Sequence, residues 1–144
     1  MSFDCVVDAS VGTKLFLLEP LSDRADVLFA HLTDNPPARF YVPDLFFIEC
    51  TSVLWKYVHC FDYPLESAHQ DVADLTGLPL RTVSTGELAG EALEIAAIHG
   101  ITAYAASYVA LARRLSLPLV TADESLVRCL AEMAFDVRWL GEWP

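Results

Sequence analysis

Short apolar runs alternate with longer stretches of helical periodicity along the chain. Five short runs, rich in β-branched or aromatic residues, predict strands at 3–7, 39–42, 78–83, 117–121 and 135–140. Between them apolar residues recur every three or four positions, which predicts helices at 11–19, 22–34, 43–61, 64–77, 85–99, 101–116 and 123–133. The run at 78–83 is the weakest strand because Pro79 lies inside it.

Strands separated by helices favour right-handed crossovers and a parallel sheet that is covered on both faces. We therefore expect an α/β fold with three layers, α/β/α, around a four- or five-stranded, mainly parallel sheet. The chain has 144 residues, the size of one domain, and contains no linker, repeat or low-complexity segment. Residues 1–144 are expected to form a single domain.

Composition bears on the partners of the chain. Hydrophobic residues make up 54% of it and the mean hydropathy is +0.38, so we expect an oligomer in which a second subunit or a partner covers part of the apolar surface. Trp55, Tyr57 and Phe61, at helical spacing, are expected in the core or in that subunit contact. The net charge of -11 argues against a broad nucleic-acid-binding face and favours cations and basic peptides.

The cysteines indicate the compartment. They are scattered, form no CxxC pair and follow no secretory signal: Cys5, Cys50, Cys60 and Cys129. We expect a cytoplasmic protein with reduced thiols packed in the core, and neither a disulfide framework nor a zinc site. The weakly charged region 88–112 is broken by His99 and Gly100, which predicts two amphipathic helices and no membrane span.

Three acidic residues stand where an ordinary fold would not require them. Asp8 directly follows the strand at 3–7, and Asp123 lies two residues past the strand at 117–121. The carboxyl ends of parallel strands meet at one rim of a sheet, so these acids are expected close together. Glu49 falls near the apolar stripe of the helix at 43–61, where a carboxylate needs a compensating partner.

Simpler interpretations exist for two of the acids. Asp8 and Asp123 each precede a predicted helix, and either could serve only as an N-cap. Capping does not account for Glu49, which is inside its helix. Three acids converging on one rim, without clustered His or Cys, predict a metal site for Mg²⁺ or Mn²⁺. The four histidines have no metal-binding spacing and receive no role.

Four segments, in order and spacing, resemble the motifs of PIN-domain proteins, and especially VapC-like toxins of toxin–antitoxin pairs. They are VVDASV at 6–11, VPDLFFIE at 42–49, ITAYAASYVALA at 101–112 and LVTAD at 119–123. The resemblance covers nearly the whole chain. It implies a metal-dependent endoribonuclease that cleaves an RNA phosphodiester with a metal-activated water, and a cognate antitoxin as partner. It also implies pairing into a homodimer, which fits the apolar excess.

The resemblance also implies roles for particular residues. Asp8 and Asp123 would bind metal, and Glu49 would bind it directly or through water, so that these three are the expected catalytic and metal residues. Ser10 could steady a carboxylate or a water, or could serve only at the start of its helix. Two ions about 3.5 to 4 Å apart would stabilise the attacking and leaving oxygens.

One position departs from the family pattern. The tyrosine of the third motif is usually followed by a metal-binding Asp, whereas here Tyr104 is followed by Ala105. Ala105 shares a helical face with Tyr108, which predicts that it still faces the site. Two charges 4 Å apart interact by about 4 kcal/mol at an effective dielectric near 20, so we expect partial metal binding and slow or absent cleavage. Natural loss of catalysis and a deliberate replacement both fit the sequence.

Two other classes of function compete. A catalytically inactive PIN-like module could bind RNA or an antitoxin peptide, and the acidic surface suits a basic antitoxin tail. A phosphohydrolase or phospho-receiver would also place an Asp after the first strand. Neither is favoured, because no second acid follows Asp8 two residues later and no lysine follows a later strand.

Overall fold

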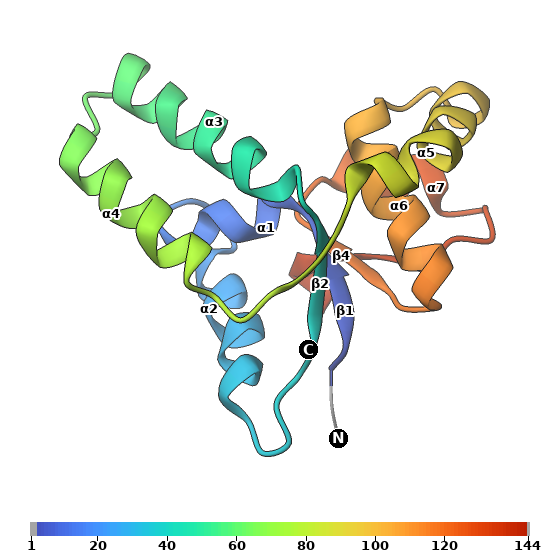
Figure 1. The fold of residues 1–144 in the computed structure, drawn as a ribbon, viewed down its shortest axis with the longest axis horizontal. Coiled ribbons are helices and arrows are strands. Elements are labelled where there is room, and N and C mark those ends of the chain that lie inside the picture. Colours follow the sequence, from blue (N-terminus) through green and yellow to red (C-terminus); the bar gives the residue numbers. More distant parts are fainter. Residues whose placement is uncertain (1–2, 144) are drawn as a thin grey trace.

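The computed structural model describes residues 3–143, which build a five-stranded sheet between two layers of helices (Figure 1). The strands are β1 (Cys5–Val7), β2 (Phe40–Pro43), β3 (Arg81–Val83), β4 (Leu119–Thr121) and β5 (Val137–Trp139). They lie in the order β3-β2-β1-β4-β5, and every neighbouring pair is parallel. The predicted three-layer fold is confirmed.

Seven α-helices flank the sheet. Figure 1 shows α1 to α4 on one side of the strands and α5 to α7 on the other. Their bounds are α1 (Ala9–Gly12), α2 (Ser22–Ala30), α3 (Phe46–Cys60), α4 (Leu65–Thr76), α5 (Thr85–His99), α6 (Ala103–Leu115) and α7 (Glu124–Leu130). Short 3-10 helices are at Thr13–Leu15, His31–Thr33 and Leu140–Glu142. The long α3 and α4 form a hairpin that projects from the sheet (Figure 1).

The core lies around the central strands. Every residue of β1 and β4 is buried, because helices cover both faces of the sheet there. A strand that is buried on both faces reads as a continuous apolar run, which is why both were visible in the sequence. Phe40 from β2 and Phe46 from α3 are among the largest fully buried side chains.

The structure differs from the predicted boundaries in several places. Pro43 ends β2 and does not open a helix, and α3 begins only at Phe46. The helix expected at 11–19 is a four-residue α1 followed by a 3-10 turn. β3 begins at Arg81, after Pro79, so the proline removes no donor from the ladder.

Two of the four predicted core cysteines are not in the core. Cys5 and Cys50 are buried, whereas Cys60 and Cys129 are exposed, and all four thiols are free. Cys60 is the last residue of the projecting α3, which packs against the rest of the chain mainly through Phe46, Cys50 and Leu54. For the same reason Trp55 is exposed. Apolar neighbours in the sequence therefore did not guarantee burial.

The two helices of the weakly charged region are short and sharply bent. Across residues 3–143 no single helix is long and apolar enough to cross a membrane. α5 and α6 would pass such a test only as a pair, and their axes are bent by 113°. Gly100, in the left-handed conformation, ends α5, and Thr102 caps α6.

Candidate active site

The strand order reverses next to β1, and the candidate site lies there. The chain adds β2 and β3 on one side of β1 and then returns to place β4 on its other side. Crevices at the carboxyl ends of strands at such a switch point are the usual ligand sites of open α/β sheets. A cavity of about 260 Å³ is found at this point, and its lining includes Asp8, Glu49, Ala105, Tyr108 and Asp123. The three acids predicted from the sequence therefore share one cavity.

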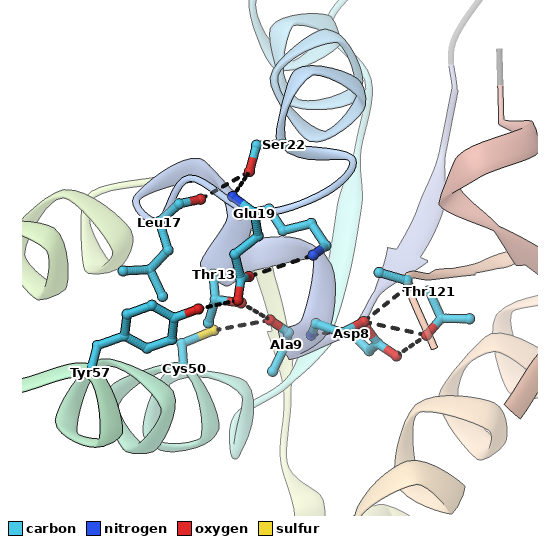
Figure 2. A network of polar contacts seen from close by, with 12 residues as sticks. Asp8, Ala9, Thr13, Leu17, Glu19, Ser22, Cys50, Tyr57 and Thr121 are labelled. Atoms are coloured by element: carbon cyan, nitrogen blue, oxygen red, sulfur yellow. Dashed lines mark hydrogen bonds and ion pairs between the residues drawn. The ribbon is translucent and has the colours of Figure 1, made fainter. Parts of the chain in front are cut away.

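Asp8 is the most constrained of the three acids. The residue is only 8% exposed, and its side chain caps α1. Oδ1 accepts hydrogen bonds from the backbone N–H of Ser10, at 3.0 Å, and from the Ser10 hydroxyl. Oδ2 accepts from the Thr121 hydroxyl at 2.5 Å (Figure 2). Burial, with a smaller contribution from the nearby Glu49, raises the pKa of Asp8 to about 6 despite the lowering effect of these hydrogen bonds.

The hydroxyls around Asp8 connect two loops of the site. Ser10 also accepts a 3.0 Å hydrogen bond from the backbone N–H of Ala122, and Thr121 accepts one of 3.1 Å from the N–H of Asp123. The turn after β1 is thereby tied to the turn after β4. Both turns carry an acid of the cavity, so their relative position is set by these contacts.

Glu49 reaches the cavity from the first turn of α3. Its side chain is half-buried, and burial raises its pKa. The Tyr108 hydroxyl, from α6, donates a 2.6 Å hydrogen bond to Oε1 of Glu49. Among the hydrogen bonds of residues 3–143 none involves Oε2, which leaves that oxygen available to a ligand.

Asp123 both caps a helix and lines the cavity. Its Oδ1 accepts from the N–H groups of Ser125 at 3.0 Å and Leu126 at 3.2 Å, and from the Ser125 hydroxyl at 2.6 Å. Within the described part of the chain no hydrogen bond reaches Oδ2. Asp8 and Asp123 are thus both N-caps, but not only N-caps, since both also line the cavity.

The three carboxylates are the right type of ligand for a hard divalent cation, but they do not surround a single ion position. Carboxylate oxygens are the ligands that Mg²⁺ and Mn²⁺ prefer. Nevertheless, over residues 3–143 no group of three or more His, Cys, Asp or Glu side chains stands close enough together to hold a metal ion. Mg²⁺ usually keeps several waters and takes one or two carboxylates plus substrate phosphates, which is compatible with this open arrangement.

Ala105 lies at the place predicted for it. It is in the first turn of α6, its backbone N–H donates a 3.1 Å hydrogen bond to the Thr102 side chain, and its methyl group lines the cavity. Position 105 therefore faces the acids but carries no ligand atom.

Tyr108 and Thr121 were missed in the sequence. Tyr108 follows Ala105 by three positions, and that helical spacing was the only signal for it. Thr121 ends a buried strand, and a polar side chain there was the corresponding signal. Neither signal indicates which carboxylate the hydroxyl contacts, because the two elements that carry each pair are distant in the sequence.

The fold agrees with the comparison to known families. The model of the PIN domain matches residues 5–130, so the chain belongs to the PIN domain family. The family predicted from the four motifs is confirmed.

Individual relatives agree with this assignment. Ribonuclease VapC3 of Pyrobaculum aerophilum is 29% identical over 123 residues, which are 84% of this chain and 90% of that relative. The crystal structure of PAE2754 from the same organism has a TM-score of 0.68 at 24% identity and covers 90% of this chain and 87% of its own. A toxin–antitoxin complex from Klebsiella pneumoniae has a TM-score of 0.65 at 14% identity, covering 93% and 95%. At these identities the two structures show a shared fold.

Proposed function

We propose that this protein is a VapC-like PIN-domain ribonuclease that acts on RNA, with catalysis weakened or lost because position 105 is alanine. The observation that carries the proposal is the cavity at the switch point, which Asp8, Glu49 and Asp123 line together with Ala105. The relative named Ribonuclease VapC3 supports the reaction class. The proposed setting is the cytoplasm, and the proposed unit is the single domain of residues 1–144.

The acids would hold a divalent cation, Mg²⁺ or Mn²⁺, beside the RNA phosphate. A cation bound there neutralises phosphate charge and lowers the pKa of bound water. Ser10 and Thr121 keep Asp8 in one orientation, and Tyr108 does the same for Glu49. Each carboxylate oxygen has two lone pairs, so Asp8 retains acceptor capacity despite its hydrogen bonds.

The missing carboxylate would affect metal binding first. Each acid that faces the cavity adds attraction for the cation, and Ala105 adds none. We therefore propose weak binding of one ion at Asp8, Glu49 and Asp123, with one or two of these carboxylates binding it directly and the rest through water, and with little occupancy of a second position. Slow cleavage would follow, because a weakly held ion would neutralise the phosphate charge for only part of the time.

The proposed partners are an antitoxin and a second copy of this chain. The structure of the toxin–antitoxin complex from Klebsiella pneumoniae supports the antitoxin, and the net charge of -11 suits a basic segment of it. Trp55 and Phe61, which are 61% and 62% exposed, support a homodimer that covers them. Analytical ultracentrifugation of the chain and of Trp55→Glu tests the dimer, which the variant should weaken.

Restoring the absent acid tests the proposed activity. Ala105→Asp should bind Mn²⁺ about tenfold more tightly in isothermal titration calorimetry, equivalent to about 1.4 kcal/mol, and should cleave single-stranded RNA with Mg²⁺. Ala103→Asp is the matched control, since Ala103 is in the same helical turn but lies outside this cavity. Ala103→Asp should change neither property.

The inactive module is the second candidate, and Ala105 is the observation that favours it. The same experiment separates the two. If Ala105→Asp is folded, binds Mn²⁺ no more tightly than the parent chain and cuts no RNA, the cavity is not a nuclease site. Antitoxin binding that is unaffected by EDTA in the parent chain would then support a role in binding alone.

A further inference from the structure

A second cavity adjoins the candidate active site. Its volume is about 380 Å³, and it lies between the start of α6 and the start of α7. It shares Thr102, Ala105, Asp123 and Leu126 with the cavity of the acids. The two cavities are therefore neighbours with a common wall, and any group bound in the second one would sit beside the acids.

Ala105 is part of that common wall. Its side chain is a single methyl group, so little material separates the two cavities at this position. A longer side chain here would project between them. Ala105 thus brings no carboxylate to the first cavity and fills little of the space between the two.

The lining of the second cavity is suited to an uncharged group. Ile101 and Leu126 supply apolar surface, and in the described part of the chain no lysine or arginine lines the cavity. A phosphate would find no cation here and would be repelled by Asp123. Phosphate binding is therefore disfavoured.

Two hydroxyls give the cavity a hydrogen-bond pattern. Thr102 accepts from the N–H of Ala105 at 3.1 Å, so its own O–H remains free to donate. Ser125 donates its O–H to Asp123 at 2.6 Å, so its lone pairs remain free to accept. The cavity thus presents one donor and one acceptor beside apolar walls, as sites that bind a flat polar ring do.

We propose that this second cavity, lined by Ile101, Thr102, Ala105, Ser125 and Leu126, is a base subsite that holds the nucleobase of a nucleotide next to the phosphate bound at the acids. The proposal rests on the proposed ribonuclease function. Single-stranded RNA is recognised mainly through bases that are splayed away from their neighbours into such pockets, by apolar contact and by hydrogen bonds to their edges. Ala105 lets the binding be measured while cleavage is weak or absent.

Cys129 provides a way to block the base subsite. Cys129 is an exposed residue that lines this cavity but not the cavity of the acids, and its thiol donates a weak 3.4 Å hydrogen bond to the carbonyl of His99. Cys60 is the other exposed thiol, on α3, and Cys5 and Cys50 are buried. The Cys60→Ser variant treated with N-ethylmaleimide is thus labelled at Cys129, and Cys129→Ser treated likewise is labelled at Cys60 as the matched control. Cys129→Phe fills the same space without a reagent.

The experiment measures the affinity of full-length protein for four short homopolymeric RNAs, of A, C, G and U, in the presence of Mn²⁺. Labelling Cys129 should weaken binding of at least one homopolymer about tenfold and should reduce the differences among the four. Cys129→Phe should do the same. The label at Cys129 should leave the Mn²⁺ affinity unchanged. The control labelled at Cys60 should bind RNA as the unlabelled protein does.

Other results would overturn the proposal. If protein labelled at Cys129 binds all four RNAs as unlabelled protein does, the base subsite is wrong although the ribonuclease function stands. If the label lowers the Mn²⁺ affinity as much as the RNA affinity, Cys129 opens onto the acids and there is no separate subsite. If unlabelled protein binds no RNA, the proposed function fails, and the subsite fails with it.

Discussion

The hydroxyl of Tyr108 donates a 2.6 Å hydrogen bond to Oε1 of Glu49 in the cavity at the switch point of the sheet. The two residues come from opposite helical layers, α6 and α3, and Tyr108 is only 2% exposed. A buried tyrosine with a fixed hydroxyl leaves Glu49 little rotational freedom. The other carboxylate oxygen of Glu49, Oε2, is thereby left available to a ligand in the cavity.

The first prediction is that Tyr108→Phe lowers Mn²⁺ affinity about tenfold with little change in fold. The phenyl ring keeps the packing, whereas the loss of the hydroxyl releases Glu49 and removes a charge-assisted hydrogen bond of about 1.5 to 3 kcal/mol. Isothermal titration calorimetry measures the affinity, and thermal unfolding checks the fold.

A double-mutant cycle decides whether Tyr108 acts through Glu49. In a Glu49→Gln background, Tyr108→Phe should cost little further Mn²⁺ affinity, since the carboxylate it positions is gone. Tyr57→Phe is the matched control, because Tyr57 donates a similar 2.5 Å hydrogen bond to Glu19 away from the cavity. Equal losses of affinity in both backgrounds would show that Tyr108 acts independently of Glu49.

The acids were predictable because topology brings them together. Asp8 and Asp123 follow buried strands, and the carboxyl ends of parallel strands meet at one rim whatever the helices do. Tyr108 was not predictable as a partner of Glu49, since that contact depends on how two helical layers face each other. Burial was also unpredictable for Cys60, because sequence neighbours do not reveal that the end of α3 projects from the sheet.

The second prediction concerns the pH dependence of stability without metal. Burial raises the pKa of Asp8 from 3.8 to about 6, so its contribution to stability is complete below pH 3.8 and is lost as pH rises through about 6. The loss is about 3 kcal/mol. The amide of Asp8→Asn cannot ionise. The free energy of unfolding of this variant, relative to that of the parent chain, should therefore increase as pH rises over the same range. Urea unfolding in EDTA at several pH values measures it.

Asp44 offers a control of opposite sign. The N–H and hydroxyl of Thr85 donate hydrogen bonds of 3.0 and 2.8 Å to it and lower its pKa. Its contribution is therefore present above its unfolded pKa of 3.8 and is lost as pH falls through the lowered value. Asp44→Asn should matter least at the lowest pH. If the difference in free energy of unfolding between the parent chain and Asp8→Asn did not vary with pH, burial would not raise the pKa of Asp8 as described.

The third prediction compares two helix ends that have the same backbone conformation. Gly100 ends α5 at φ +69°, and Ser116 ends α6 at φ +55°. Only glycine adopts this region without a steric cost, so Ser116→Gly should stabilise the protein by about 0.5 to 1 kcal/mol, and Gly100→Ser should destabilise it by a similar amount. A Cβ at Gly100 would meet no atom within 4 Å, so the cost there is one of backbone alone. Chemical denaturation of both variants tests the pair, and equal signs would contradict it.

The fourth prediction concerns the close approach of α1 and α3 beneath the acids. A Cβ on Gly12 would lie 2.6 Å from Cζ of the fully buried Phe46 and 3.3 Å from Sγ of Cys50, so Gly12→Ala must displace the Phe46 ring, and we expect α3 to move away from α1 with it. Overpacking of this kind costs about 1 to 3 kcal/mol. Because Asp8 caps α1 and Glu49 is in the first turn of α3, the same displacement should also weaken Mn²⁺ binding.

Gly90→Ala is the matched control. Gly90 is inside α5, and an added Cβ would have no atom within 4 Å, so this change should stabilise the protein by about 1 kcal/mol and leave the Mn²⁺ affinity unchanged. If Gly12→Ala were as stable as the parent chain, the spacing of α1 and α3 would not depend on the missing side chain.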